Sequence, residues 1–327
     1  MRHRWLTLLL LIGLPLEARG DSIYALWIVY PAGSVQLARF DAATPGLPEY
    51  PFPPDPYLPP FSIEFDPATR QLWGFDYFIC LTLCPPAHDP FLLDPLTGSW
   101  SFVHLPGLQL ESLLGMDTDI DPRTRELRYF GGLTGNSSYS LDRLENRADE
   151  PLSPPFHVVA VAHKPPVGGA QGIETYVVGR LPGQGLAPSG TPWYQLARIG
   201  GPGGDPPASS GEVTIIGPVN IPAERLWFDI AADGTAYLAA LLQGVPDGEA
   251  NRLYRVDLAS GALDEIGILT QPGGSAFLSG IAVAPPGLGE SVVVIPALSG
   301  VGLGLFALAL CAVAVRRLPR RRAVASS

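Results

Sequence analysis

Cysteine is scarce in this chain of 327 residues, which has three, and none forms the Cys-x-x-Cys pair typical of zinc clusters. Cys80 and Cys84 stand four positions apart. In an extended strand their Cα atoms would lie about 13 Å apart, which is too far for a disulfide. A turn before Pro85 would bring them together, so a disulfide and two free thiols both remain open. Cys311 lies in an apolar run, where a small apolar residue is expected.

Catalytic motifs are also missing. None of the five histidines has the His-Glu-x-x-His spacing of a zinc enzyme, and no Gly-x-Ser-x-Gly elbow is present. The glycine-rich run 200–204 lacks the Lys-Ser/Thr that follows in a phosphate loop. His157 and His163 would share one face of a strand, and His163 would either face a channel or hydrogen-bond within the strand. No pattern assembles a nucleophile, a base and an orienting group, so we expect neither an enzyme nor a cofactor.

Positive charge is rare between the two ends of the chain. The net charge of the whole chain is −10. When the eight arginines and the one glutamate of residues 1–20 and 292–327 are set aside, 13 basic and 30 acidic residues remain, a net charge of −17. A surface of this sign repels phosphate backbones and attracts cations. It therefore argues against nucleic acid as a partner.

The first twenty residues have the layout of a secretory signal peptide. A basic start precedes an apolar run over 5–16, and Ala18 and Gly20 place small residues at the two recognition positions for cleavage. The apolar run is too short for a first membrane helix. We expect the secretion machinery to export the chain and cleavage to occur before Asp21.

Two segments of the middle region align without gaps, namely 61–75 and 116–130. Asp66-Pro67 matches Asp121-Pro122, and Thr69-Arg70 matches Thr124-Arg125. Each segment predicts a strand, a tight turn with aspartate at its start and proline after it, and a second strand. A related unit surrounds Asp233, and a degenerate copy begins at His157. A second signature, in which aspartate follows an alternating strand, recurs at Asp41, Asp94, Asp142 and Asp257.

A repeat near 50 residues with four strands per unit indicates an all-β, propeller-like ring. Residues 22–30 are typical of the second strand of a unit, and residues 277–285 of a first strand, so together they would complete one blade and close the ring. This predicts about five four-stranded blades. The long segment 165–220 leaves room for a sixth blade or an insertion, and a β-sandwich is the rival fold. The tryptophans of the strands are expected to pack between blades or, alternatively, to form a sugar-binding platform: Trp27, Trp73, Trp100 and Trp227.

Three alternating aspartates, Asp117, Asp119 and Asp121, would lie on one face of a strand. Alternating aspartates can begin a calcium loop, but the sixth and twelfth positions of an EF-hand would fall on Pro122 and Arg128. Asp121 is also the turn residue of the repeat. Incidental Ca²⁺ binding by these carboxylates therefore remains open without a calcium-binding motif.

The ectodomain resembles a family of exported bacterial propeller-like domains of unknown function. Units of the form "DPATRQLWGF" (66–75) and "LYRVDLASGALDEIG" (253–267) carry this resemblance. The C-terminal segment resembles the IPTL-CTERM class of bacterial sorting signals, related to the PEP-CTERM class. Its motif would be Ile295, Pro296, Ala297, Leu298 and Ser299, in which alanine replaces the usual threonine. The resemblance implies processing by an exosortase-type enzyme.

The physical pattern of the C-terminal segment agrees with a membrane span. Residues 297–315 would extend about 28 Å as a helix, enough for the hydrocarbon core. A basic cluster follows on one side only and would hold that end in the cytoplasm: Arg316, Arg317, Arg320, Arg321 and Arg322.

The predicted organisation is a signal peptide (1–20), a propeller-like ectodomain (21–286), a linker (287–294) and a sorting signal (295–322). We expect an exported protein, first held in the inner membrane and then sorted to the surface. Its non-catalytic ectodomain would either bind an extracellular polysaccharide or protein or have a structural role. Two alternatives remain. The first is a hydrolase or lyase of an extracellular polymer, which acids and histidines converging in one pocket would favour. The second is a simple single-pass anchored protein.

Overall fold

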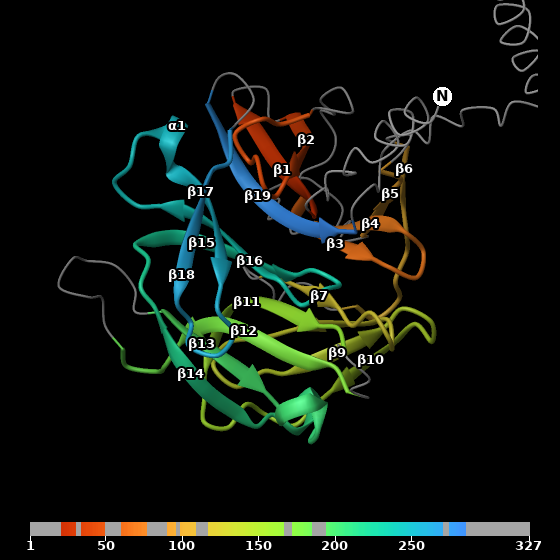
Figure 1. Cartoon of the computed structure of the whole chain (residues 1–327). Coiled ribbons are helices and arrows are strands. Elements are labelled where there is room, and N and C mark those ends of the chain that lie inside the picture. The colour runs from red at the N-terminus through yellow and green to blue at the C-terminus, as the bar shows by residue number, and fades with distance from the viewer. Residues whose placement is uncertain are drawn as a thin grey trace, which may run out of the picture. The chain divides into compact units, whose positions relative to one another are not determined.

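The computed structural model describes residues 21–30, 34–49, 60–76, 90–95, 99–108, 117–166, 172–184, 194–270 and 275–285. All of them belong to one compact unit, Met1–Gly289. Strands dominate this unit (Figure 1), and its short helical pieces are α1 (Asp247–Ala250), η2 (Pro202–Gly204) and η3 (Ala208–Ser210).

The strands form five antiparallel sheets, which we call blades 1 to 5 in ring order. Blade 1 contains β3 (Pro60–Asp66), β4 (Gln71–Asp76), β5 (Phe91–Leu93) and β6 (Trp100–Phe102). Blade 2 contains β7 (Asp119–Ile120), β8 (Glu126–Tyr129), β9 (Ser137–Ser140) and β10 (Glu145–Ala148). Blade 3 contains β11 (His157–Lys164), β12 (Glu174–Arg180), β13 (Tyr194–Ile199) and β14 (Val213–Val219). Blade 4 contains β15 (Ala223–Ile230), β16 (Ala236–Leu242), β17 (Asn251–Val256) and β18 (Leu263–Ile268), and blade 5 contains β19 (Ser275–Ala284), β1 (Ser22–Tyr30) and β2 (Ser34–Asp41).

In each blade, the strand that is named first above lies innermost in the ring. These strands contact one another in the closed order β3, β7, β11, β15, β19 and again β3. The chain is therefore a five-bladed, all-β propeller. This confirms the predicted ring and excludes the β-sandwich. Four blades have the predicted four strands, whereas blade 5 has three among the described residues.

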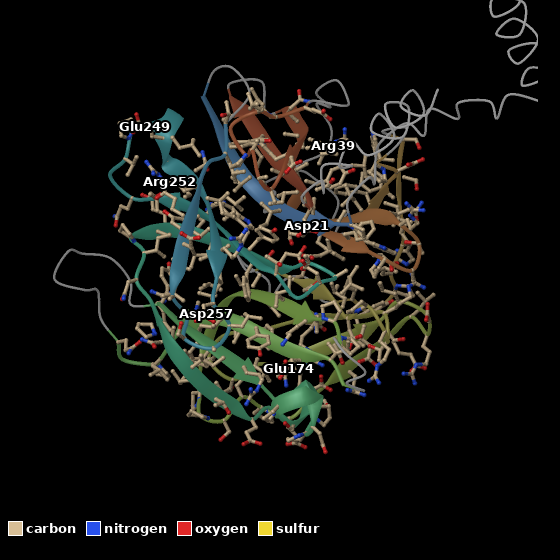
Figure 2. All side chains as sticks on the ribbon, viewed as in Figure 1. Asp21, Arg39, Glu174, Glu249, Arg252 and Asp257 are labelled. Atoms are coloured by element: carbon tan, nitrogen blue, oxygen red, sulfur yellow. The ribbon has the colours of Figure 1, made fainter. Side chains whose placement is uncertain are left out.

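Blade 5 closes the ring with strands from both ends of the described chain. β1 pairs with β19, from Ser22 opposite Ala284 to Tyr30 opposite Ser275, and its other edge pairs with β2. The hydroxyl of Tyr237 in blade 4 donates a hydrogen bond to Asp21 Oδ2 at 2.9 Å, at the start of blade 5 (Asp21 is labelled in Figure 2). The predicted closure is confirmed. The segment 165–220 holds no sixth blade in its described part, because it supplies β12, β13 and β14.

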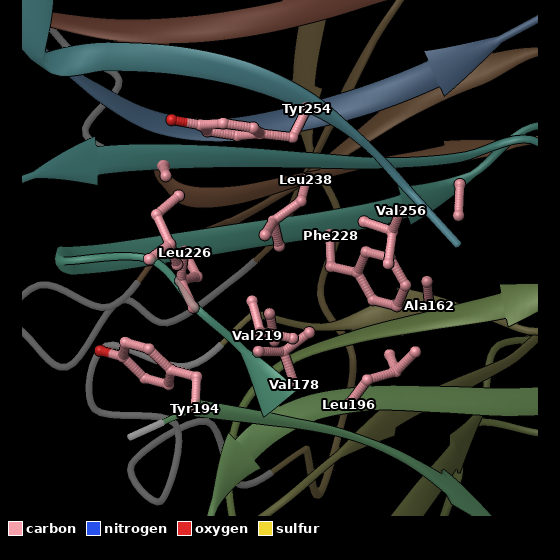
Figure 3. Packing of buried hydrophobic residues seen from close by; sticks show 14 of the residues in the cluster. Ala162, Val178, Tyr194, Leu196, Val219, Leu226, Phe228, Leu238, Tyr254 and Val256 are labelled. Atoms are coloured by element: carbon pink, nitrogen blue, oxygen red, sulfur yellow. The ribbon is translucent and has the colours of Figure 1, made fainter. Parts of the chain in front are cut away.

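Five hydrophobic clusters lie at the interfaces between successive blades. Figure 3 shows the cluster between blades 3 and 4, where Val178 and Leu196 face Phe228 and Leu238. No blade can bury both of its faces alone, so this packing holds the ring together. Trp27 and Trp227 share the cluster between blades 4 and 5, and Trp73 lies in that between blades 1 and 2. These three side chains are buried between blades, as predicted, so their rings offer no platform for a sugar.

The matched turns of blades 1 and 2 have the same geometry. Asp66 Oδ1 accepts the N–H of Ala68 at 2.9 Å, and Asp121 Oδ1 accepts the N–H of Arg123 at 2.8 Å. Arg70 and Arg125, at the same position of each turn, both adopt left-handed backbone angles, with φ of 58° and 53°. The predicted repeat is therefore also a repeat of backbone conformation.

Several predicted features lie outside the described residues. They are the signal peptide with Ala18 and Gly20, the pair Cys80 and Cys84, and the whole segment 295–322. Among the residues that the structure does describe, no helix has the length and apolar character needed to cross a membrane.

Candidate functional site

A pocket of about 260 Å³ opens on the ring axis, at the ends of the five inner strands. Each blade contributes one wall residue and, two positions later, one rim residue. The wall residues are Phe65, Ile120, His163, Ile230 and Val283. The rim residues are Pro67, Pro122, Pro165, Ala232 and Pro285. We call this cavity the axial pocket, and its lining is apolar except for His163 and two aspartates.

The two aspartates of the axial pocket, Asp119 and Asp229, precede the wall residues of blades 2 and 4. Each carboxylate accepts the N–H of the residue that follows it, Ile120 or Ile230, at 2.6 Å with Oδ1. The other oxygen, Oδ2, accepts a backbone N–H from the next blade. Asp119 Oδ2 accepts that of His163 in blade 3, and Asp229 Oδ2 accepts that of Val283 in blade 5. Both aspartates therefore link neighbouring inner strands around the axis.

Two further acids, Glu64 and Asp117, lie buried near these aspartates. The hydroxyl of Ser62 is 3.1 Å from Glu64 Oε1 and 3.0 Å from Asp117 Oδ1, and the hydroxyl of Thr118 donates to it at 3.3 Å. Asp117 Oδ2 accepts the N–H of Phe228, from the inner strand of blade 4, at 2.9 Å. We call Glu64, Asp117, Asp119 and Asp229 the axial acids.

The proton count of this network is constrained by Ser62. A serine hydroxyl has one hydrogen, so it cannot donate to Glu64 and Asp117 at the same time. Both contacts are hydrogen bonds only if one of the two carboxyl groups carries its own proton. Asp117 already accepts the N–H of Phe228, which favours its charged form, and we therefore place the proton on Glu64.

The electrostatics of the axial acids agree with this assignment. Burial raises the pKa of Glu64 well above its usual range, and the nearby charges of Asp119, Asp117 and Asp229 raise it further. Burial also raises the pKa of Asp117, against the opposing effect of the hydrogen bonds from Phe228 and Ser62. The pKa of Asp229 rises to about 8, through burial first and then through the charge of Asp119. The cluster therefore holds protons at neutral pH.

His163 is the one basic side chain in the lining of the axial pocket, and it is 4 % exposed. Its Nδ1 lies 2.9 Å from Asp119 Oδ2, so an Nδ1–H donates to that carboxylate. Its Nε2 makes no hydrogen bond within the part of the chain that the structure describes. In the neutral ring this nitrogen is an acceptor. A β-bulge between Val158 and Ala160 interrupts the strand alternation, so His157 and His163 do not share a face as the simple alternation predicted.

The three aspartates predicted as possible calcium ligands are divided by the structure. Asp117 and Asp119 are buried among the axial acids. Asp121 instead caps the turn, where its Oδ1 accepts the N–H groups of Arg123 and Thr124 at 2.8 and 2.9 Å. Among the described residues, no group of three His, Cys, Asp or Glu side chains is arranged to hold a metal ion.

Sequence reasoning missed Glu64 and Asp229 as partners of the two buried aspartates. A signal for Glu64 was present, because the ungapped alignment of 61–75 with 116–130 places Glu64 opposite Asp119. Asp229 occupies the same place in blade 4, because it directly precedes the wall residue Ile230 as Asp119 precedes Ile120. The related unit around Asp233 therefore also carried a signal for Asp229.

Comparisons with known proteins identify no family for this chain. No family model and no curated protein matches the chain. Among solved structures, the chain is similar to TolB from Acinetobacter baumannii, with 13 % sequence identity and a TM-score of 0.42. The match covers 76 % of this chain and 53 % of that one, so this chain spans about half the length of the TolB structure.

Proposed function

We propose that this protein is exported to the bacterial cell envelope and that its propeller binds a ligand there without transforming it. The axial pocket is the observation that carries the proposal. It gathers residues from all five blades into one apolar cavity with a few polar groups, which is the usual composition of a binding site. Its position on the axis means that only the closed ring can form it.

The chemistry of the pocket lining supports binding over catalysis. No serine, threonine, cysteine, tyrosine or lysine is among the described residues that line it, so the lining supplies no hydroxyl, thiol or amine nucleophile. The carboxylates of Asp119 and Asp229 accept backbone N–H groups from adjacent blades. This ties them to the structure of the ring.

A second candidate function is a hydrolase or lyase that acts on an extracellular polymer. The specific observation in its favour is the pair Asp119 and His163, in which a carboxylate orients an imidazole that lines the axial pocket. Such an imidazole could act as a general base toward water. Acids and a histidine converge in this pocket, which is the arrangement expected for a hydrolase or lyase.

Export and sorting are part of the same proposal and rest on the sequence. The signal-peptide pattern of 1–20 and the apolar segment with its terminal arginines support a route through the inner membrane. The resemblance of 295–299 to a sorting motif supports removal of the C-terminal segment by an exosortase-type enzyme, and a simple single-pass anchor is the alternative. Mass spectrometry of the mature protein decides between them: loss of Arg316–Arg322 is expected, and their retention would leave the anchor.

Co-sedimentation with isolated envelope polysaccharide, combined with analysis of released products, tests binding against catalysis. We expect the protein to sediment with its ligand and to release no low-mass products. Release of products that stops in His163→Asn, a variant that keeps an N–H near the place of Nδ1, would establish the enzyme instead. Asp264→Asn, an exposed change in blade 4, serves as the control.

A further inference from the structure

The chemistry of the axial pocket also restricts the class of ligand, and this inference rests on the proposed binding function. The pocket volume of about 260 Å³ is slightly below the range of about 300–1,000 Å³ that is usual for small-molecule sites. Its wall and rim offer aliphatic, proline and phenyl surfaces from every blade. The ligand part that enters is therefore small and has an apolar body.

The charges around the pocket favour a positive head group. No arginine or lysine is among the residues that line it, whereas Asp119 and Asp229 are. Glu64 and Asp117 lie close enough for the charges of Asp119 and Asp229 to affect their ionisation. The charge of Asp119, which also raises the pKa of Glu64, is only weakly screened in a buried site. Asp229 retains its proton in the free protein at neutral pH, because its pKa is raised to about 8, and a cation beside it would favour its ionised form.

His163 supplies the second and independent observation. Its side chain is 96 % buried, lines the pocket and, in the neutral tautomer set by Asp119, leaves Nε2 as an acceptor that no described residue satisfies. A ligand that donates a hydrogen bond could therefore use this nitrogen as its acceptor. Because Asp119 and Asp229 line the same pocket, a donor that carries positive charge is favoured.

We propose that the axial pocket binds the ammonium group of a small primary amine, with His163 Nε2 and the carboxylates of Asp119 and Asp229 as acceptors. The alkyl part of the amine packs against the wall residues. Each carboxylate oxygen has two lone pairs, so Asp119 Oδ1 and the two oxygens of Asp229, each of which accepts one backbone N–H, can accept a second donor. An ammonium group has three N–H donors, which matches three acceptors.

Calorimetric titration of the full-length protein at pH 7.5 with four probes tests this proposal. Butylammonium has both charge and N–H donors, tetramethylammonium has the charge alone, 1-butanol has an uncharged donor, and butyrate has the opposite charge. We expect butylammonium to bind about tenfold or more tightly than 1-butanol and tetramethylammonium, because charge-assisted hydrogen bonds are the stronger ones. Butyrate is expected not to bind.

Three variants test whether butylammonium binds in the axial pocket. Ala232→Trp fills the exposed rim without touching the acids, and we expect it to abolish binding of butylammonium. Ala259→Trp, at an exposed turn of the same blade, is the matched control and should bind as the original protein does. His163→Asn removes Nε2 and keeps an amide N–H for Asp119, so it should weaken binding about tenfold with little effect on unfolding.

The outcomes separate the ligand class from the binding function. Equal affinity for butylammonium and 1-butanol, or undiminished binding by Ala232→Trp, would overturn the ammonium proposal. Binding of 1-butanol or butyrate that Ala232→Trp abolishes would leave the pocket as a binding site and reject only the class. If none of the probes binds, the ammonium proposal fails, and co-sedimentation with polysaccharide still decides the proposed function. Titration with Nα-acetyl-lysine amide shows whether a protein side chain can supply the same ammonium group.

Discussion

Asp229 Oδ2 accepts the backbone N–H of Val283 at 2.5 Å, across the boundary between blade 4 and the closing blade. Asp119 makes the equivalent bond to the N–H of His163, between blades 2 and 3. In both cases the accepting residue precedes a wall residue of its own blade, and the donor is the wall residue of the next blade. An aspartate directly before the wall residue therefore links the inner strands of neighbouring blades at two of the five interfaces.

Asp229→Ala should weaken the ring by leaving two buried N–H groups, those of Ile230 and Val283, without their acceptor. At pH 5, where the carboxyl group is neutral in the fold, we expect the free energy of unfolding to fall by about 1–3 kcal/mol. Urea unfolding followed by tryptophan fluorescence measures this, since Trp27 and Trp227 are buried beside blade 5. The control Asp264→Ala should change the value by less than about 0.5 kcal/mol. Equal effects of the two variants would contradict the role of Asp229.

The axial acids predict a pH dependence of stability. The pKa of Asp229 is raised from 3.8 to about 8, so the fold favours the neutral carboxyl group. The stability that this group contributes is fully present below its unfolded pKa and is lost as the pH rises through about 8. Within this window each such group lowers the free energy of unfolding by about 1.4 kcal/mol per pH unit.

Unfolding at several values between pH 5 and pH 9 checks this expectation. Asp229→Asn cannot lose a proton, so its free energy of unfolding should fall less steeply with pH than that of the original protein. Only the slopes are compared, because the amide also loses one acceptor. Parallel slopes would show that Asp229 does not retain its proton in the fold.

Variants of Arg70 and Arg125 separate the contribution of ion pairing to stability from that of the backbone geometry. Both residues have positive φ at the same turn position, but Arg125 Nη2 lies 2.9 Å from the buried carboxylate of Asp66, and Arg125 also donates to Asp142. Arg125→Ala should cost about 1–3 kcal/mol, because it leaves Asp66 buried without its charge partner. Arg70 is exposed and makes no ion pair among the described residues, so Arg70→Ala should have an effect below about 0.5 kcal/mol. Thermal unfolding of both variants gives the difference.

Gly280 marks a close approach between the closing strand β19 and the inner strand of blade 1. A Cβ at this position would lie 2.9 Å from the backbone nitrogen of Ile63 and 3.2 Å from the Cα of Ser62. Gly280→Ala should therefore push β19 away from β3 and lower the free energy of unfolding by about 1–3 kcal/mol. Gly248→Ala, where a Cβ meets nothing within 4 Å, is the control. Denaturation midpoints that coincide for the two variants would show that the ring has room at its closure.

Much of the fold was predictable because turn chemistry is local. Aspartate at a turn start, proline after it and the alternating strands on either side act within about ten residues, so their recurrence near every 50 residues was visible in the sequence. The incomplete units at residues 22–30 and 277–285 likewise predicted the closure that β1 and β19 make. The short strand β7 was harder, because the structure pairs only Asp119 and Ile120 where a full strand was expected.

The amino-acid sequence determined the repeat and the residues that begin each turn, and it predicted about five blades. The tertiary structure decided which polar residues meet. Glu64 and Asp229 are separated by 165 positions, and only the closed ring brings them to the same axis. The sequence around Asp229 does not indicate that its carboxyl group is buried, retains a proton and accepts an N–H from the neighbouring blade. Burial and nearby charge depend on the whole ring and not on the flanking residues.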